Sequence, residues 1–248
     1  SGIEVNGGTE SNDLPASNTT ITGNIFDMTA VDDEPCARTA IDVSASDVIV
    51  GDNQVYVRGV CDPLLVGIKL QDGAMNLNVH DNLLKSCGTA ITTQRNQGRI
   101  GKVLDSVTFL RKEGLLFPAL ERRDSHRYRG WNIVWLKNGK ADGASVIDCF
   151  DPETCCFKLR ERRDMKVDDV FDVFPPAGAN WNIHNNTITG CLMPVKLDSY
   201  GSESSLLTDN IITRGAATGV KTAVEVHGIF KLIDNHVSGF DEESSAAL

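Results

Sequence analysis

One six-residue pattern recurs along the chain: an apolar residue, two polar residues, Asn, any residue, and a second apolar residue. Its first copy is Ile21-Thr22-Gly23-Asn24-Ile25-Phe26. The recurring Asn residues are Asn24, Asn53, Asn82, Asn186, Asn210 and Asn235. Their spacings are 29, 29, 104, 24 and 25 residues, and Asp precedes the Asn in four of the six copies. A near-constant period of this length is typical of stacked structural repeats.

A second segment lies between the Asn turns and alternates apolar with polar residues. Examples are Val66-Gly67-Ile68-Lys69-Leu70 and Thr222-Ala223-Val224-Glu225-Val226. Alternation with period two indicates a half-buried strand, and helical periodicity is not evident. Short strands separated by Asn, Asp and Gly turns predict a solenoid whose coils stack about 4.8 Å apart. We expect the Asn to adopt the left-handed backbone of a sharp turn and its amide to bond neighbouring coils.

The Asn register and the strand after it resemble the single-stranded right-handed parallel β-helix of the pectin-lyase-like superfamily. The resemblance covers residues 18–94 and 181–240. It implies an all-β fold in one domain, 1–248, with about 6–9 coils, clear over 18–97 and 179–240. The superfamily includes polysaccharide lyases, glycoside hydrolases, uronate epimerases, phage tailspikes and adhesins, so the resemblance indicates architecture more than function.

The repeat fades over residues 98–178, and two interpretations remain open there. The gap of 104 residues equals four steps of 26, which favours three further coils with long decorating loops. The alternative is one β-rich excursion that packs as an inserted lobe. Cys87 and Cys191 each follow a recurring Asn by five residues. They become neighbours only if the segment is an excursion; with three intervening coils they lie about 19 Å apart, too far for a disulfide.

The seven cysteines cannot all pair within one chain. Cys36 and Cys61 are 25 residues apart, about one coil, and are candidates for a bridge. Buried thiols are an equal alternative, because Cys packs well as a small apolar residue.

Charge is unevenly distributed along this acidic chain, whose formal net charge is −10. Residues 95–140 hold 11 basic and 4 acidic side chains, including the loop 121–129. A basic block of this size indicates a local anion site rather than a nucleic-acid surface, although a solvated face or paired Glu-Arg-Arg-Asp segments would also explain it. No apolar run approaches the roughly 18–20 residues of a membrane span.

In the superfamily that the chain resembles, ligands usually bind in the groove beside the strand that follows the long turn, here Gly67-Ile68-Lys69-Leu70. Alternation places these residues inward: Ile68, Leu70, Ile91, Val195, Leu197, Val224 and Val226. It places these outward: Asp42, Lys69, Gln71, Thr92, Gln94, Lys196, Asp198, Glu225 and His227. Such a stripe suits sugar hydroxyls and carboxylates, although any solvent-facing strand is polar.

Three kinds of chemistry can be compared on this stripe. Asp198 and Glu225 could form the carboxylate pair of a hydrolase, but the polygalacturonase motifs are missing. β-Elimination needs a base and a cation that neutralises the enolate. We therefore predict as catalytic residues Lys69, Arg95, Lys196 and His227. We predict as substrate-binding residues Gln71, Gln94, Arg122, Arg123, His126, Arg127, Tyr128, Asp198, Tyr200 and Glu225. Calcium is a candidate cofactor at the Asp-rich turns, but no ligand set is identifiable.

Together these features predict a secreted or cell-surface protein that binds or acts on an anionic polysaccharide, uronate or sulfated, with β-elimination as the enzymatic version. The alternative is a non-catalytic interaction module, such as an adhesin, a tailspike-like protein or a structural surface protein. The expected partner is a polysaccharide, with no nucleic acid and no membrane span, and oligomers would form through the solenoid ends.

Overall fold

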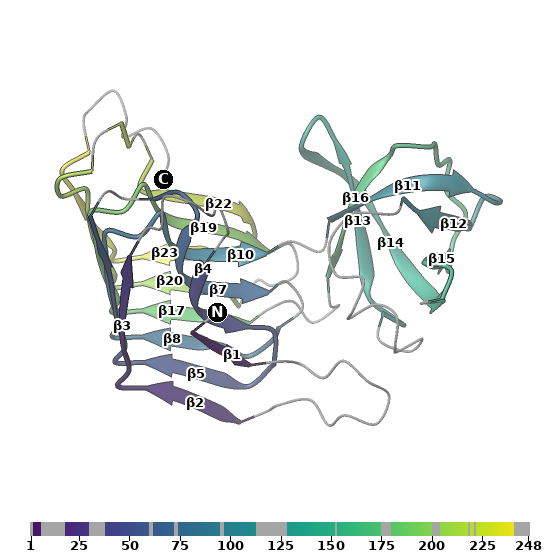
Figure 1. Ribbon diagram of the computed structural model, residues 1–248. Helices are drawn as coiled ribbons and strands as arrows, with labels where there is room; N and C mark the ends of the chain where they lie inside the picture. The colour runs from purple at the N-terminus through teal and green to yellow at the C-terminus, as the bar shows by residue number, and fades with distance from the viewer. Residues whose placement is uncertain are drawn as a thin grey trace.

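The computed structural model describes most of the chain as strands and turns (Figure 1). The described residues are 2–5, 18–29, 38–59, 62–71, 74–94, 97–112, 128–151, 153–174, 180–199, 204–217, 219–220 and 222–240. Across these ranges the structure is all-β, and it has no helix with the length and apolar character to cross a membrane.

Three parallel sheets of six strands each stack into a solenoid. Sheet A consists of β1 (Ile3–Val5), β4 (Arg38–Val43), β7 (Leu65–Gln71), β10 (Thr89–Gln94), β19 (Met193–Ser199) and β22 (Val224–Gly228). Sheet B consists of β2 (Thr19–Thr22), β5 (Val48–Gly51), β8 (Asn78–His80), β17 (Asn182–His184), β20 (Leu206–Thr208) and β23 (Lys231–Ile233). Sheet C consists of β3 (Ile25–Thr29), β6 (Gln54–Arg58), β9 (Leu83–Lys85), β18 (Thr187–Thr189), β21 (Ile211–Thr213) and β24 (His236–Ser238). Figure 1 shows these strands layered above one another, as expected for a parallel β-helix.

The recurring Asn residues form a continuous ladder at the turn between sheets B and C. The backbone N–H and side-chain amide of Asn24 both donate to Oδ1 of Asn53, at 3.1 and 2.9 Å. The same two bonds link each later Asn to the next one, and they join Asn82 to Asn186 at 3.1 and 2.9 Å. The predicted amide stacking is therefore confirmed.

The prediction that the ladder Asn adopts the left-handed backbone is wrong, because the residue one position before it adopts that backbone. The residues with positive φ are those just before each ladder Asn: Gly23, Asp52, Asp81, Asn185, Asp209 and Asp234. Asp and Asn tolerate this backbone because their short polar side chains bond locally, which explains why they occupy this position in five of six turns. The side-chain amide of each ladder Asn instead forms hydrogen bonds to the neighbouring coils.

The described strands between residues 97 and 174 form a separate β-barrel rather than further coils. Its strands are β11 (Gln97–Val103), β12 (Thr108–Arg111), β13 (Asn132–Lys137), β14 (Lys140–Asp151), β15 (Cys156–Leu159) and β16 (Val170–Phe174). They close in the order β11-β12-β15-β14-β13-β16, with every pair antiparallel. Strands β8, β9 and β10 pair directly with β17, β18 and β19. The favoured prediction of three intervening coils is thus wrong, and the excursion alternative describes the fold.

The two units have separate cores of different character. The solenoid interior is stacked mainly from Val, Ile and Leu, with Trp181 as its one fully buried ring within the described chain. The barrel core is aromatic, and Phe109, Phe157 and Phe171 lie with ring centroids 5.2–5.7 Å apart. No residue belongs to both clusters, so each unit buries its own apolar surface.

Cys87 and Cys191 lie on adjacent coils, as the excursion alternative requires. Leu192 N donates to Cys87 O at 3.2 Å, and both cysteines are fully buried. The Cys191 thiol contacts the carbonyls of Thr189 and Leu84 at 3.6 and 3.9 Å. These positions favour the alternative in which the cysteines are buried as small apolar side chains. The proposed Cys36–Cys61 bridge lies outside the described residues.

Two histidines stack on the outward face of sheet B above a glycine. His80 and His184 are 5.3 Å apart with an interplanar angle of 14°, and His80 Nδ1 lies 2.7 Å from Asp81 Oδ2. A Cβ on Gly51 would lie 2.6 Å from His80 Cε1. Gly51 therefore makes room for the ring.

Gly51→Ala should lower the free energy of unfolding by about 1–2 kcal/mol, because His80 must leave its stacked position. Urea unfolding measures the change. In a His80→Ala background the same substitution should cost almost nothing. Equal penalties in both backgrounds would show that the clash is not with the imidazole.

Candidate functional site

The strand register of sheet A places six residues in one line, beginning with Glu4 on β1, and the five after Glu4 run from β4 to β22. Lys69 is paired with Asp42 on one side and with Thr92 on the other, Thr92 with Lys196, and Lys196 with Glu225. We call these five residues the charged row. Successive members are one strand apart, about 4.8 Å, so the row crosses β4, β7, β10, β19 and β22.

One end of the charged row is a largely buried ion pair. Lys69 Nζ contacts Asp42 Oδ2, and the two side chains are 23% and 6% exposed. Gln71 Nε2 donates to Asp42 Oδ1 at 3.2 Å, so both carboxylate oxygens have partners. Hydrogen bonding of both oxygens offsets part of the cost of burying the carboxylate.

The other end of the charged row is more open. Lys196 Nζ lies 3.3 Å from Glu225 Oε1, and His227 Nε2 lies 3.5 Å from the same oxygen. The side chains of Lys196 and His227 are 42% and 47% exposed. Glu225 therefore links an ammonium group and an imidazole that solvent can reach.

The row is symmetric about Thr92. Each lysine lies one strand from Thr92, and each has its acidic partner on the far side. The two lysine Cα positions are therefore about 10 Å apart, two strand spacings. Lysine stems are long enough for both ammonium groups to reach an anion held above Thr92. The arrangement can bind a carboxylate or sulfate at its centre.

The structure brings part of the predicted site together. Lys69, Lys196, Glu225 and His227 share one face, as alternation predicted. Gln71 belongs to the same face but is buried, and its amide serves Asp42. The predictions that fall outside the described side chains are Arg95, Gln94, Arg122, Arg123, His126, Arg127, Asp198 and Tyr200.

The prediction that Tyr128 binds substrate is wrong. Its side chain is 3% exposed and belongs to the barrel core, where its ring lies 5.2 Å from those of Trp131 and Phe150. Tyr128 follows a strongly charged run, which suggested an exposed loop. The aromatic cluster decides its position instead, because burying a ring of this size removes a large apolar area from water.

Sequence reasoning placed Asp42 on the outward face but did not include it in the site. The available signal was the alignment of Ile41-Asp42-Val43 with Ile68-Lys69-Leu70, which puts opposite charges side by side. Metal binding has no support in the described part of the chain, where no three His, Cys, Asp or Glu side chains form a group that could hold an ion.

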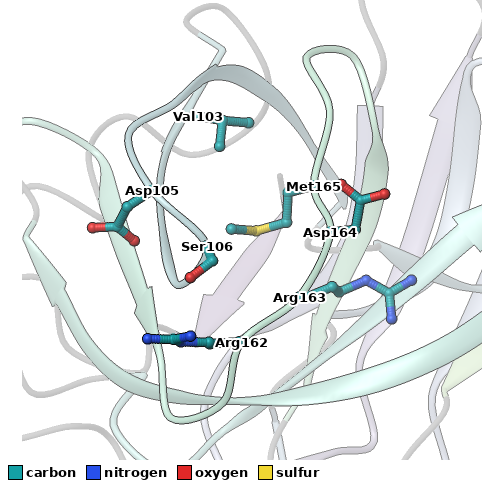
Figure 2. A pocket seen from close by; sticks show the side chains of 7 residues that line it. All are labelled: Val103, Asp105, Ser106, Arg162, Arg163, Asp164 and Met165. Atoms are coloured by element: carbon teal, nitrogen blue, oxygen red, sulfur yellow. The ribbon is translucent and has the colours of Figure 1, made fainter.

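The barrel has a hollow of about 480 Å³, lined by Val103, Asp105, Ser106, Arg162, Arg163, Asp164 and Met165 (Figure 2). Asp105 accepts hydrogen bonds from Val107 N and Thr108 N at 2.7 and 2.8 Å, and the Val107 bond is the main cause of its lowered pKa. Arg163 lies 4.8 Å above the Trp135 ring and donates to Asp142 O at 2.9 Å. Two acidic and two basic residues line this hollow, so it has no excess of either charge. The contacts of Asp105 and Arg163 hold turns in place. The charged row is therefore the better candidate for a functional site.

No family model matches the chain, and no curated protein matches it closely enough to indicate a relative.

Proposed function

We propose that the protein binds an acidic polysaccharide along the outward face of sheet A. In this proposal a carboxylate of the polymer is held above Thr92, between Lys69 and Lys196. The observation that carries it is the strand register, which sets two lysines symmetrically around a hydroxyl residue. Charge-assisted hydrogen bonds from two ammonium groups are strong interactions for a carboxylate.

The ion pairs of the free protein are consistent with such a ligand. Asp42 and Glu225 hold the lysines on the face, and the residue between the two lysines, Thr92, is uncharged. The Lys196–Glu225 pair is partly exposed and therefore contributes little stability, so a ligand carboxylate can compete for Lys196 at low cost. Lys69 is more buried than Lys196, so it is the fixed one of the two lysines that would hold the ligand carboxylate.

A linear polymer fits the shape of the row better than a compact ligand. Polar groups repeat at each strand across five strands, and the step of about 4.8 Å is of the same order as the length of one sugar unit. Successive units would therefore meet Lys69, Thr92, Lys196 and Glu225 in turn. Open, polar faces of this kind bind through many modest contacts rather than one enclosed pocket.

Cleavage by β-elimination is the second candidate, and the contacts of Glu225 favour it. Glu225 Oε1 orients both Lys196 and His227. In this reaction the neutral imidazole takes the proton next to the carboxylate, and the lysines stabilise the enolate charge. The C–O bond to the leaving sugar then breaks as a C=C bond forms, and the imidazolium gives its proton to the leaving oxygen.

Binding to alginate, pectate and glycosaminoglycans tests the first candidate. Lys69→Ala and Lys196→Ala should each weaken binding about tenfold, or 1.4 kcal/mol, as measured by calorimetry. Lys85→Ala is the matched control, because Lys85 is an exposed outward lysine on sheet C. An equal loss in the control, or no binding to any of the glycans, would contradict the proposal.

The same samples test cleavage through the ultraviolet absorbance of unsaturated uronate. If the protein cleaves, His227→Ala should lose the absorbance while its affinity changes less than that of Lys196→Ala. Binding without new absorbance or reducing ends would leave the protein as a binding module.

A further inference from the structure

The solenoid has two open ends, because none of its three sheets closes on itself. Each sheet runs from a first-coil strand, β1, β2 or β3, to a last-coil strand, β22, β23 or β24 (Figure 1). Each of these end strands pairs with a described strand on one side only. An edge strand exposes backbone N–H and C=O groups that can pair with another chain, and the ends of a solenoid normally need a cap.

The two end coils also leave part of the solenoid core exposed. In the described chain, the partly buried apolar side chains that pack against this core are Ile3, Phe26 and Met28 in the first coil and Ala223, Val226, Phe230, Val237 and Phe240 in the last coil. Leu232 is 37% exposed, whereas Leu207, its inward neighbour one coil back, is fully buried. Both ends therefore present apolar side chains on which a further coil can stack.

The Asn ladder has a direction, which makes the two ends complementary. At every rung the backbone N–H of one Asn donates to Oδ1 of the next, as from Asn210 to Asn235 at 3.1 Å. The residue after the next Asn donates back, as from His236 N to Asn210 O at 2.8 Å. No further rung exists among the described residues, so the last coil presents the N–H and C=O of Asn235. The first coil presents the matching groups, Oδ1 of Asn24 and the N–H of Ile25.

We propose that the protein associates with itself head to tail, with the last coil of one copy stacked on the first coil of the next. Asn235 N–H then donates to Asn24 Oδ1 of the next copy, and Ile25 N–H of that copy donates back to Asn235 O. These two bonds repeat those between successive coils within the chain. Because the contact joins two different surfaces by a step along the solenoid axis, it builds an open stack rather than a closed dimer.

The same register brings inward apolar side chains together. It places Leu232 on Ile21 and Val237 on Phe26 of the next copy, which continues the inward lines of sheets B and C. Burial of these side chains favours association, and parallel pairing supplies partners for the exposed strand edges. A tail-to-tail contact would use neither Ile21 nor Asn24, which makes the two arrangements distinguishable.

On sheet A the register brings two carboxylates together. Glu4 is at one end of the line of residues that contains the charged row, and Glu225 is at the other. Continuing the line into the next copy places Glu225 beside Glu4. Directly opposed like charges weaken strand pairing, although Lys196 and His227 already lie near Glu225 and offset part of the repulsion. The charge of Glu4 therefore controls how strongly the copies associate.

Sedimentation velocity of the chain without any polysaccharide tests the stack. The wild type should form larger species as its concentration rises. Leu232→Lys in the last coil and Asn24→Lys in the first should each weaken association about tenfold or more, because the contact would bury an unpaired ammonium group. The matched control is Ile211→Lys, which puts the same charge on an exposed outward position one coil from the end. The control should associate as the wild type does.

Mixing the two lysine variants isolates the head-to-tail arrangement. Each variant alone should stay monomeric, but an equimolar mixture should form a dimer and nothing larger, since each variant has the intact end that the other lacks. Circular dichroism checks that both keep their β-sheet signal. Glu4→Gln should strengthen association about threefold, because it removes the repulsion from Glu225. Glu4 is exposed, so this variant tests the register even if a lysine variant fails to fold.

Three results would overturn the proposal or part of it. A wild type that stays monomeric at every concentration overturns self-association. Association that survives Asn24→Lys but not Leu232→Lys indicates tail-to-tail pairing and overturns the head-to-tail register. Unchanged association in Glu4→Gln overturns the placement of Glu225 beside Glu4. Because no polysaccharide is present, none of these results depends on whether the charged row binds one.

Discussion

Replacing Asn186 by Ala should lower the free energy of unfolding of the solenoid by about 4 kcal/mol. Asn186 is fully buried, and its Oδ1 accepts from both the backbone and the side-chain amide of Asn82 at 3.1 and 2.9 Å. Its own amide donates to Asn210 Oδ1 at 2.9 Å and to Val79 O at 3.0 Å. Alanine leaves several buried donors and acceptors without partners, each at a cost of about 1–3 kcal/mol.

The matched control is Asn24→Ala at the first rung of the same ladder. Asn24 is partly exposed, so water can replace the bonds that it loses. We expect a cost of about 1 kcal/mol or less. Urea titration with hydrogen exchange of peptides from 180–199 measures both. Equal losses at the two positions would show that burial of the ladder is not what makes it stabilising.

The Asn ladder could be predicted because each rung depends on a local sequence pattern. The direct bond between Asn82 and Asn186, which spans the most residues, could not be predicted. Each coil contacts only its neighbours, so an insertion at one turn leaves every other contact unchanged. Asn82 and Asn186 bond directly although 104 residues separate them. The sequence distance is a multiple of 26, and this arithmetic fits three extra coils as well as one insertion. The direct pairing of β8, β9 and β10 with β17, β18 and β19 distinguishes the two.

The candidate site was predictable to the level of the sheet face. Alternation correctly put Lys69, Lys196, Glu225 and His227 on one side of sheet A. Alternation does not indicate how deeply a side chain is buried. It therefore did not predict that Gln71 is buried beside Asp42 rather than open to a ligand.

The strand order of the barrel had no comparable signal in the sequence. It depends on antiparallel pairing between strands far apart in sequence, such as β11 with β16. A hydrophobic pattern does not specify which strands pair in a closed barrel, so the order β11-β12-β15-β14-β13-β16 is known only from the structure.

Replacing Phe157 by Ala should destabilise the barrel by about 4 kcal/mol and leave the solenoid unchanged. Phe157 is 1% exposed, and its ring lies 4.5–5.7 Å from those of Phe150, Phe109 and Phe171. Removing it opens a cavity at the centre of the aromatic core. The solenoid is unaffected because its core shares no residue with the barrel and its coils pair directly across the insertion.

Leu84→Ala is the reciprocal variant, since Leu84 is fully buried in the solenoid core. Hydrogen exchange should lose protection in peptides from 153–174 for Phe157→Ala, and in peptides from 180–199 for Leu84→Ala. If either variant caused loss of protection in both sets of peptides, the two units would unfold as one cooperative structure. Separate responses would mean that the chain combines two folding units, each stabilised by its own core. In that case the barrel can be altered or removed without disturbing the register that builds the charged row.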